Sequence, residues 1–250
     1  MRNKTHSSVW DRFPKLKSIS KEKFPNHLLI IPDGNGRWAQ RFSKLPVFGH
    51  RKGREVLKQI LDDLQELPIH FITVWGFSTG NWKRSKAEVK ALMSIFEKAV
   101  NENLPRLIET GTRFIHIGRE DRIPKSLKNA IRNSEIKTKT NRKRVFCLAI
   151  DFGGEDQELR MMEKIRDLPK NIKITPQVVE KLRDAQGLIP QADLIIRTSG
   201  EQRTSDLGWL ERNSEFYSIK KLLPMTATSD FIEAIIDYSK RNRRFGARPK

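Results

Sequence analysis

The stretch HLLIIPDGNGRW, residues 27–38, begins as a buried strand and ends as the start of a helix. Leu28–Ile31 are all apolar, which is typical of a strand interior. Asp33 follows, and Gly34 and Gly36 leave the backbone N–H groups open to close approach by a ligand. Arg37 and Trp38 then open a helix, whose N-terminus favours an anion. The stretch therefore brings a carboxylate, accessible backbone N–H groups and a cation close together in the sequence.

This combination indicates a metal and phosphate site. A carboxylate repels a bound anion unless a hard cation bridges the two, so we interpret Asp33 as a ligand for Mg²⁺ bound to a phosphate. Asp-Gly and Asn-Gly are also common turn pairs. Taken alone, the stretch is equally compatible with an ordinary turn.

The rest of the chain alternates between strand and helix patterns. Apolar runs predict strands at 69–75, 113–118, 145–150, 193–197 and 215–219. Helices are predicted at 53–67, from the capping box Ser85–Glu88, from Thr175-Pro176, and at 230–242. Such alternation predicts an α/β fold with a mostly parallel sheet covered on both faces. Ligands in such folds bind beyond the carboxyl ends of the strands.

Composition narrows the class of protein. The 250 residues are 37% hydrophobic, enough for a core, and contain neither an apolar run that could span a bilayer nor a signal-peptide pattern. The single cysteine, Cys147, lies in the apolar run VFCLAI and is interpreted as a buried structural thiol. We predict a cytoplasmic protein.

The net charge of +19 favours anionic partners: nucleic acid, an acidic membrane surface or phosphorylated substrates. Basic clusters lie at 137–144 and 240–250, and residues 1–25 read as a basic, loosely held N-terminal arm. Neither an aromatic platform nor a known nucleic-acid motif accompanies the charge, so nucleic acid is not the expected partner. The positive charge is compatible with peripheral association with an acidic membrane surface.

Two more polar segments follow predicted strands. Residues 75–84, WGFSTGNWKR, mix aromatic, hydroxyl, amide and basic side chains, which suits a site where an apolar tail meets a polar head. Residues 196–205, IRTSGEQRTS, carry two arginines and several hydroxyls, which suits a diphosphate. Each has a simpler reading: tryptophans that fill the core, and a surface loop with an ion pair to Glu201.

The motifs HxxxxPDGNGRW, FGHRxxG, FSxxNWxR and RTSGEQR, in this order, resemble the cis-prenyltransferase family, the undecaprenyl diphosphate synthase-like enzymes. The resemblance extends from about residue 27 to the RRFG at 243–246. It implies a central, mostly parallel six-stranded sheet flanked by helices, with an apolar tunnel, in a catalytic domain at 26–250. The aspartate-rich DDxxD boxes of trans-prenyltransferases do not occur in the sequence.

The resemblance also implies the reaction and its residues. Such enzymes join an allylic diphosphate to isopentenyl diphosphate with Mg²⁺ and release diphosphate. Asp33 and Glu215 match metal ligands, and Ser78 and Asn81 match residues near the reacting carbons. The allylic diphosphate cradle corresponds to Gly34, Asn35, Gly36, Arg37, Trp38 and His50. The prenyl channel corresponds to Phe77 and Trp82, and the isopentenyl diphosphate clamp to Arg84, Arg197, Arg203 and Ser205. Arg244 and Gly246 match an Arg-x-Gly that reaches across a homodimer interface.

Some positions depart from the family pattern. Gly80 stands where a glutamate is usual, Pro46 replaces an arginine, and 151–155 read DFGGE in place of Asn-Tyr-Gly-Gly-Arg. The span 205–215 is one residue short. These departures predict altered handling of the second substrate: a short product, non-head-to-tail coupling, or another acceptor. A non-catalytic partner subunit and a nucleic-acid-binding protein are the competing interpretations.

Overall fold

The computed structural model describes residues 7–244 and Gly246. Six strands form one sheet in the order β3-β4-β2-β1-β5-β6, and every adjacent pair is parallel. The strands are β1 (His27–Ile31), β2 (Phe71–Ser78), β3 (Thr112–Ile117), β4 (Arg144–Phe152), β5 (Leu194–Arg197) and β6 (Glu215–Ser218). The predicted α/β fold with a mostly parallel six-stranded sheet is confirmed.

Helices connect the strands. They are α1 (Val9–Arg12), α2 (Asn35–Gln40), α3 (Pro46–Leu64), α4 (Lys86–Glu109), α5 (Lys125–Thr138), α6 (Gly154–Arg166), α7 (Pro176–Leu182) and α8 (Thr228–Lys240), with 3₁₀ turns η1 (Pro14–Ser18), η2 (Lys21–Lys23), η3 (Thr79–Lys83), η4 (Gly208–Glu211) and η5 (Leu223–Met225). α3 starts at Pro46 and not at 53, because proline is favoured in a first helical turn. α5 and α6 were not predicted, since their polar sequences bury only a few side chains.

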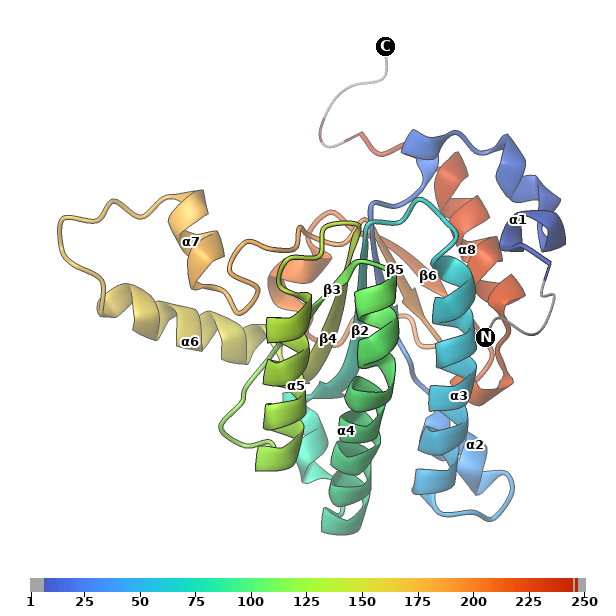
Figure 1. The fold of residues 1–250 in the computed structure, drawn as a ribbon, viewed down its shortest axis with the longest axis horizontal. Helices are drawn as coiled ribbons and strands as arrows, with labels where there is room; N and C mark the ends of the chain where they lie inside the picture. The colour runs from blue at the N-terminus through green and yellow to red at the C-terminus, as the bar shows by residue number, and fades with distance from the viewer. Residues whose placement is uncertain (1–6, 245, 247–250) are drawn as a thin grey trace.

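The two faces of the sheet carry separate cores. Leu28 and Ile30 of β1 join a cluster with α3, α4, α5 and α8, whereas Leu29 and Ile31 face a cluster with segments 185–195 and 207–210. The alternation follows from the two-residue period of a strand. In Figure 1, α3, α4 and α5 lie side by side in front of the sheet.

The N-terminal segment packs against this body. Val9 and Leu16 are fully buried, and Arg12 forms an ion pair with Asp63 of α3. The predicted loose arm is therefore wrong for residues 7–24, because their apolar side chains are part of the core. Residues 1–6 lie outside the described part of the chain.

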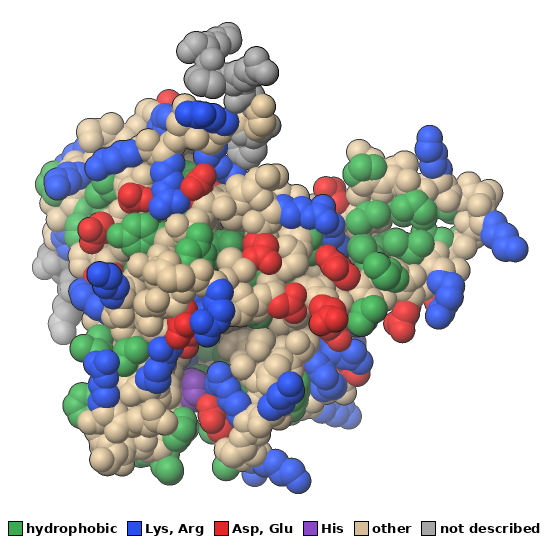
Figure 2. Space-filling view, turned by 180° about the vertical axis from the view of Figure 1, so that it is seen from behind, with side chains coloured by type: hydrophobic (Ala, Val, Ile, Leu, Met, Phe, Trp, Pro, Cys, Tyr) green, Lys and Arg blue, Asp and Glu red, His purple; other side chains and the backbone are tan. Residues whose placement is uncertain are grey.

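One segment projects from the body. α6 and α7 extend sideways in Figure 1, and apolar side chains gather on this arm in Figure 2. Leu159 and Met162 of α6 are 59% and 58% exposed.

Within the described residues, no helix has the length and hydrophobicity needed to cross a bilayer. Cys147 is buried, and burial raises the pKa of its thiol to about 12, as expected for a structural thiol.

Candidate functional site

A cavity of about 590 Å³ lies between α3, α4 and the sheet. Its polar end is at the carboxyl edge of the sheet, where β1, β2 and β5 end. Many of the predicted site residues line it: Asp33, Gly34, Asn35, Gly36, Arg37, His50, Ser78, Asn81, Arg84, Arg197 and Ser205. The three polar segments of the sequence therefore meet in one place.

Asp33 is held between two arginines. Its Oδ2 accepts a 2.9 Å hydrogen bond from Arg197 of the neighbouring strand, and its Oδ1 lies 3.4 Å from the Arg37 guanidinium. Burial by itself raises the pKa of this carboxyl, but the hydrogen bond and charge of Arg197 more than offset that effect and lower the pKa below its usual value. Asp33 is thus a carboxylate at neutral pH.

The turn after β1 brings backbone to the same end of the cavity. Gly34 has φ +100°, and a Cβ there would meet Leu222, so glycine is required. In the first turn of α2, the N–H groups of Asn35, Gly36 and Arg37 have no intrahelical acceptor. No atom lies within 4 Å of a Cβ built on Gly36. This backbone is open to an anion.

Arg197 organises the loop after β5. Its guanidinium donates to the Arg203 carbonyl (2.5 Å) and to the Ser205 hydroxyl (2.8 Å) as well as to Asp33. Its side chain is only 8% exposed. The Arg197 guanidinium therefore binds Asp33, which follows β1, and also holds the loop that follows β5.

His50 and Arg84 both contact Glu88, an acid that was not predicted as a site residue. Glu88 Oε1 lies 3.1 Å from His50 Nε2 and accepts a 3.1 Å hydrogen bond from Arg84. Burial lowers the pKa of His50, although Glu88 opposes the shift, so the imidazole is neutral at pH 7. Glu88 was interpreted only as a capping residue. Its backbone N–H does bind Ser85, but its carboxylate lines the cavity.

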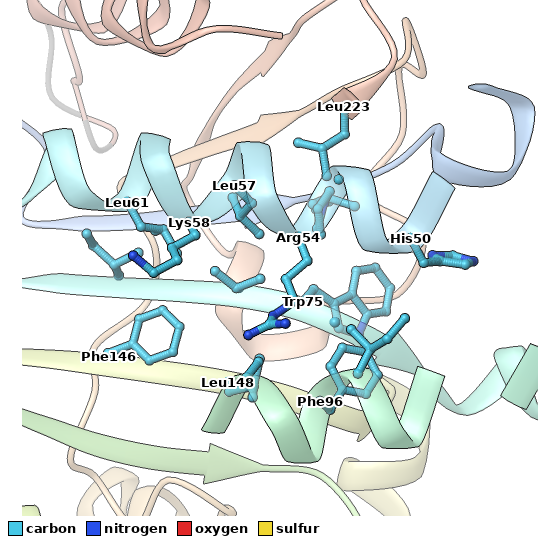
Figure 3. A pocket seen from close by; sticks show the side chains of 18 of the residues that line it. His50, Arg54, Leu57, Lys58, Leu61, Trp75, Phe96, Phe146, Leu148 and Leu223 are labelled. Carbon is cyan, nitrogen blue, oxygen red and sulfur yellow. The ribbon is translucent and has the colours of Figure 1, made fainter. Parts of the chain in front are cut away.

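The aromatic side chains that line the cavity are not the ones that the sequence predicts. Phe77 is buried and packs edge-on against Trp82 at 5.3 Å, and neither is among the residues that line the cavity. Aromatic lining comes instead from Trp75, Phe96, Phe114 and Phe146. Figure 3 shows Leu57 and Leu61 of α3 pointing toward Phe146 and Leu148 of β4, with Phe96 of α4 opposite.

Trp82 has another contact, which positions the loop containing Asn81. Its Nε1 donates to Asp151 at the end of β4 (2.8 Å), and Arg122 binds the same carboxylate through two nitrogens. Asp151 is fully buried and has φ +54°. Next to Trp82, Asn81 Oδ1 accepts the Ser78 N–H at 3.1 Å. Asp151, one of the departures from the family pattern, thus supports the loop that faces the cavity.

Replacing Asp151 by asparagine should lower the free energy of unfolding by about 2 kcal/mol, because the guanidinium of Arg122 loses its charged partner. Denaturant unfolding measures the change. Arg166→Gln is the control, since it removes an exposed pair with Asp167 and should cost less than about 1 kcal/mol. Equal stabilities of wild type and Asp151→Asn would contradict this account.

Other predicted site residues lie elsewhere. Arg203 is exposed and paired with Glu201, and Trp38 contacts Phe42. Glu215 starts β6 and pairs with Arg241, at the amino edge of the sheet, opposite Asp33. Arg244 and Gly246 are exposed beyond α8. The described fold of one chain does not bring these residues to the cavity.

The residues present fit magnesium only together with a phosphate ligand. No group of three or more His, Cys, Asp or Glu side chains that could hold a metal ion occurs among residues 7–244 and 246. Mg²⁺ commonly binds through one or two carboxylates, substrate phosphates and water. Asp33, ionised and beside an open backbone, meets that requirement.

Residues 31–246 match the family model "Putative undecaprenyl diphosphate synthase". The chain is 38% identical to an isoprenyl transferase of Aquifex aeolicus, over 90% of this chain and 96% of that protein. It is 36% identical to the tritrans,polycis-undecaprenyl-diphosphate synthase (geranylgeranyl-diphosphate specific) of Methanocaldococcus jannaschii, over 92% and 85%.

Solved structures agree. Lavandulyl diphosphate synthase from Lavandula x intermedia, in complex with dimethylallyl diphosphate, superposes with a TM-score of 0.84 at 31% identity, over 90% of this chain and 99% of that one. A probable undecaprenyl diphosphate synthase from Campylobacter jejuni gives 0.73 at 23% identity, over 89% and 98%, and supports the fold alone.

Proposed function

The chain belongs to the undecaprenyl diphosphate synthase family of prenyltransferases, and on that premise we propose that it condenses an allylic diphosphate with isopentenyl diphosphate in a Mg²⁺-dependent reaction that releases diphosphate. The observation that supports this most is the polarity of the cavity. One end carries Asp33, Arg37, Arg197 and open backbone, and apolar side chains such as Leu57, Leu61, Val74 and Phe96 line much of the interior beside Arg54. A molecule with a diphosphate head and a hydrocarbon tail has the same division.

In this proposal the chain's own residues orient the substrates. Asp33 would hold Mg²⁺, which offsets the charge of the departing diphosphate. The N–H groups at the start of α2 would bind the phosphate oxygens, together with Arg37. Arg197 and Ser205 would bind the second diphosphate. Ser78 and Asn81, which line the same cavity, would lie near the carbons where the new bond forms and a proton leaves.

The neutral state of His50 suits a hydrogen-bonding role toward the phosphates. Because Glu88 already contacts both His50 and Arg84, a bound diphosphate would compete with this carboxylate for the two donors. The apolar interior would keep water from the allylic carbon.

Asp33→Ala should lower kcat more than tenfold, equivalent to at least about 1.4 kcal/mol, while the fold is kept, since the carboxylate faces the cavity. Purified protein would be incubated with Mg²⁺, isopentenyl diphosphate and allylic diphosphates, and products identified by mass spectrometry. Asp167→Ala serves as the control because it removes an exposed acid that pairs with Arg166 and is not among the cavity-lining residues. A variant that keeps a tenth or more of the activity would refute the role of Asp33.

The same incubation tests the competing interpretations. Turnover by the purified chain alone would exclude a non-catalytic partner subunit. A lack of turnover together with a salt-dependent gel shift on nucleic acid would favour a nucleic-acid-binding protein.

A second candidate is a coupling other than ordinary head-to-tail elongation. Gly80 and Pro46 remove a carboxylate and a guanidinium that the family pattern has near the substrates, and the chain resembles a lavandulyl diphosphate synthase. This candidate would yield a short product or use another acceptor.

Gly80→Glu tests whether the departure at 80 sets the acceptor. Gly80 is exposed, and the nearest atom to a Cβ at this position is Ser78 Oγ at 3.7 Å, an ordinary contact distance, so the backbone has room for a side chain. We expect the variant to raise the rate of isopentenyl diphosphate elongation severalfold, with Gly80→Gln as the uncharged control. Unchanged product distributions in both variants would rule out this role.

We also propose a homodimer. Glu215 lies at the sheet edge opposite Asp33, and Arg243 pairs with Asp193 at the same edge, so a second copy would bring the C-terminal Arg-x-Gly to a diphosphate. The exposed apolar side chains on the projecting arm are compatible with association. Peripheral binding to a membrane is a further expectation from the charge.

Deleting residues 244–250 should reduce kcat/KM at least tenfold while leaving the mass in solution that of a dimer. This truncation spares Arg243, whose ion pair with Asp193 ties the end of α8 to the sheet. Light scattering and steady-state kinetics provide the two readouts. A fully active truncated enzyme, or a monomeric wild type, would contradict the proposal.

A further inference from the structure

A second cavity, of about 320 Å³, lies at the sheet edge formed by β3. Its walls come from the end of β3, from α5, and from the projecting arm that carries α6 and α7 (Figure 1). It shares no lining residue with the cavity between α3, α4 and the sheet. Its volume lies within the usual range of small-molecule sites, about 300–1,000 Å³. We call it the edge cavity; His116, Glu135, Lys164, Lys181 and Arg183 are among its lining residues.

His116 brings a buried hydrogen-bond acceptor to the edge cavity. The residue is only 6% exposed, and its Nε2 lies 3.1 Å from the Ile150 carbonyl. Because a carbonyl oxygen only accepts, Nε2 carries the proton and Nδ1 has a free lone pair. No described residue donates a hydrogen bond to Nδ1. Burial lowers the pKa of the imidazole, so His116 is neutral at pH 7 and Nδ1 remains an acceptor.

Glu135 of α5 adds a second acceptor. Its Oε1 accepts the backbone N–H of His116 at 2.9 Å, a group that is available because β3 is the outermost strand. Burial raises the pKa of this carboxyl, and none of the described cations forms an ion pair with it. The second oxygen of Glu135 has no hydrogen-bond partner among the described residues. A ligand that donates two hydrogen bonds would therefore satisfy both acceptors.

The cations of the edge cavity come from the projecting arm. Lys164 belongs to α6, Lys181 to α7, and Arg183 follows α7. Lys164 Nζ donates one hydrogen bond, of 3.0 Å, to the Leu182 carbonyl, and the Arg183 guanidinium lies over the Trp209 ring at 4.7 Å. No acid in the described part of the chain forms an ion pair with any of the three cations.

The other two acids that line the edge cavity already have cations as partners. Asp184 accepts hydrogen bonds of 2.5 and 2.8 Å from Arg160, one at each oxygen. Glu120 forms ion pairs with Lys128 and Arg132. Three cations without an ion pair therefore stand against the single carboxyl of Glu135. This balance favours an anionic ligand.

We propose that the edge cavity is a second ligand site, which binds a small phosphorylated polyol. The phosphate group lies against Lys164, Lys181 and Arg183, since both residue types bind phosphate through charge-assisted hydrogen bonds. Two hydroxyl groups of the ligand donate to His116 Nδ1 and to Glu135. Leu182 is the one apolar side chain among the described residues that line the edge cavity, so a prenyl tail does not fit there. The site is thus separate from prenyl transfer.

Histidine NMR locates the binding without a measurement of activity. Protein labelled with ¹⁵N in its histidine rings would be titrated with glycerol 3-phosphate, and His116→Gln and His50→Gln would assign the two signals. A hydrogen bond to Nδ1 should move the His116 signal, with a dissociation constant below about 1 mM. His50 reports any binding at the first cavity, which it lines. A His116 signal that stays in place at about 10 mM ligand would overturn the proposal.

Lysine variants test the phosphate contacts. Lys164→Gln/Lys181→Gln should weaken the binding of glycerol 3-phosphate at least tenfold by calorimetry, because two charges are lost. The matched control is Lys170→Gln/Lys173→Gln, which changes two exposed lysines of the same arm that do not line the edge cavity. Equal affinities of the two double variants would contradict the site. Arg37→Ala should leave this binding unchanged, since Arg37 lines the other cavity.

Propyl phosphate tests the two acceptors, because it has the chain length and phosphate of glycerol 3-phosphate but no hydroxyl. The wild type should bind glycerol 3-phosphate about fivefold more tightly than propyl phosphate. Glu135→Gln should reduce this preference, since its amide can still accept the His116 N–H but replaces the second acceptor oxygen by a donor. Thermal unfolding checks that each variant is folded. Equal binding of the two ligands by the wild type would refute the assignment to a polyol.

Discussion

The contact between Asp33 and Arg197 is the constraint on which the site depends. Parallel pairing of β1 with β5 places Ile31 opposite Arg197, so the side chains that follow Ile31 and end β5 meet at one edge. Arg197 is almost buried and binds Asp33, the Arg203 carbonyl and Ser205. A buried guanidinium is stable only with such partners. Without the acid, Arg197 would keep the Arg203 carbonyl and Ser205 as partners, so the loop would retain two of its three contacts.

The cavity between α3, α4 and the sheet changes along its length. Polar and charged side chains gather at the carboxyl edge, and apolar side chains line much of the interior beside Arg54. α3 contributes to both parts, because His50, Arg54, Leu57 and Leu61 lie on one helical face. A single helix therefore contributes polar and apolar side chains to the same cavity.

The loop at 78–84 depends on a different support. Asn81 and Ser78 face the cavity, while Trp82 reaches away from it to Asp151 and Arg122. Because Asp151 is fully buried, its hydrogen bonds hold the loop from behind. The departure from the family pattern at this position is thus accommodated by an arginine from a distant segment.

The sequence by itself determined the α/β class and the polar segments that follow the strands, since periodicity and glycine positions are local properties. Contacts between distant segments could not be predicted: Glu88 beside His50, the ion pair of Arg106 with Asp62, and the separation of Glu215 from Asp33. Phe77 and Trp82 look like channel residues in the sequence, yet their rings pack into the core and on Asp151. Only the tertiary structure decided these, because side-chain direction depends on the register and packing of elements far apart in the chain.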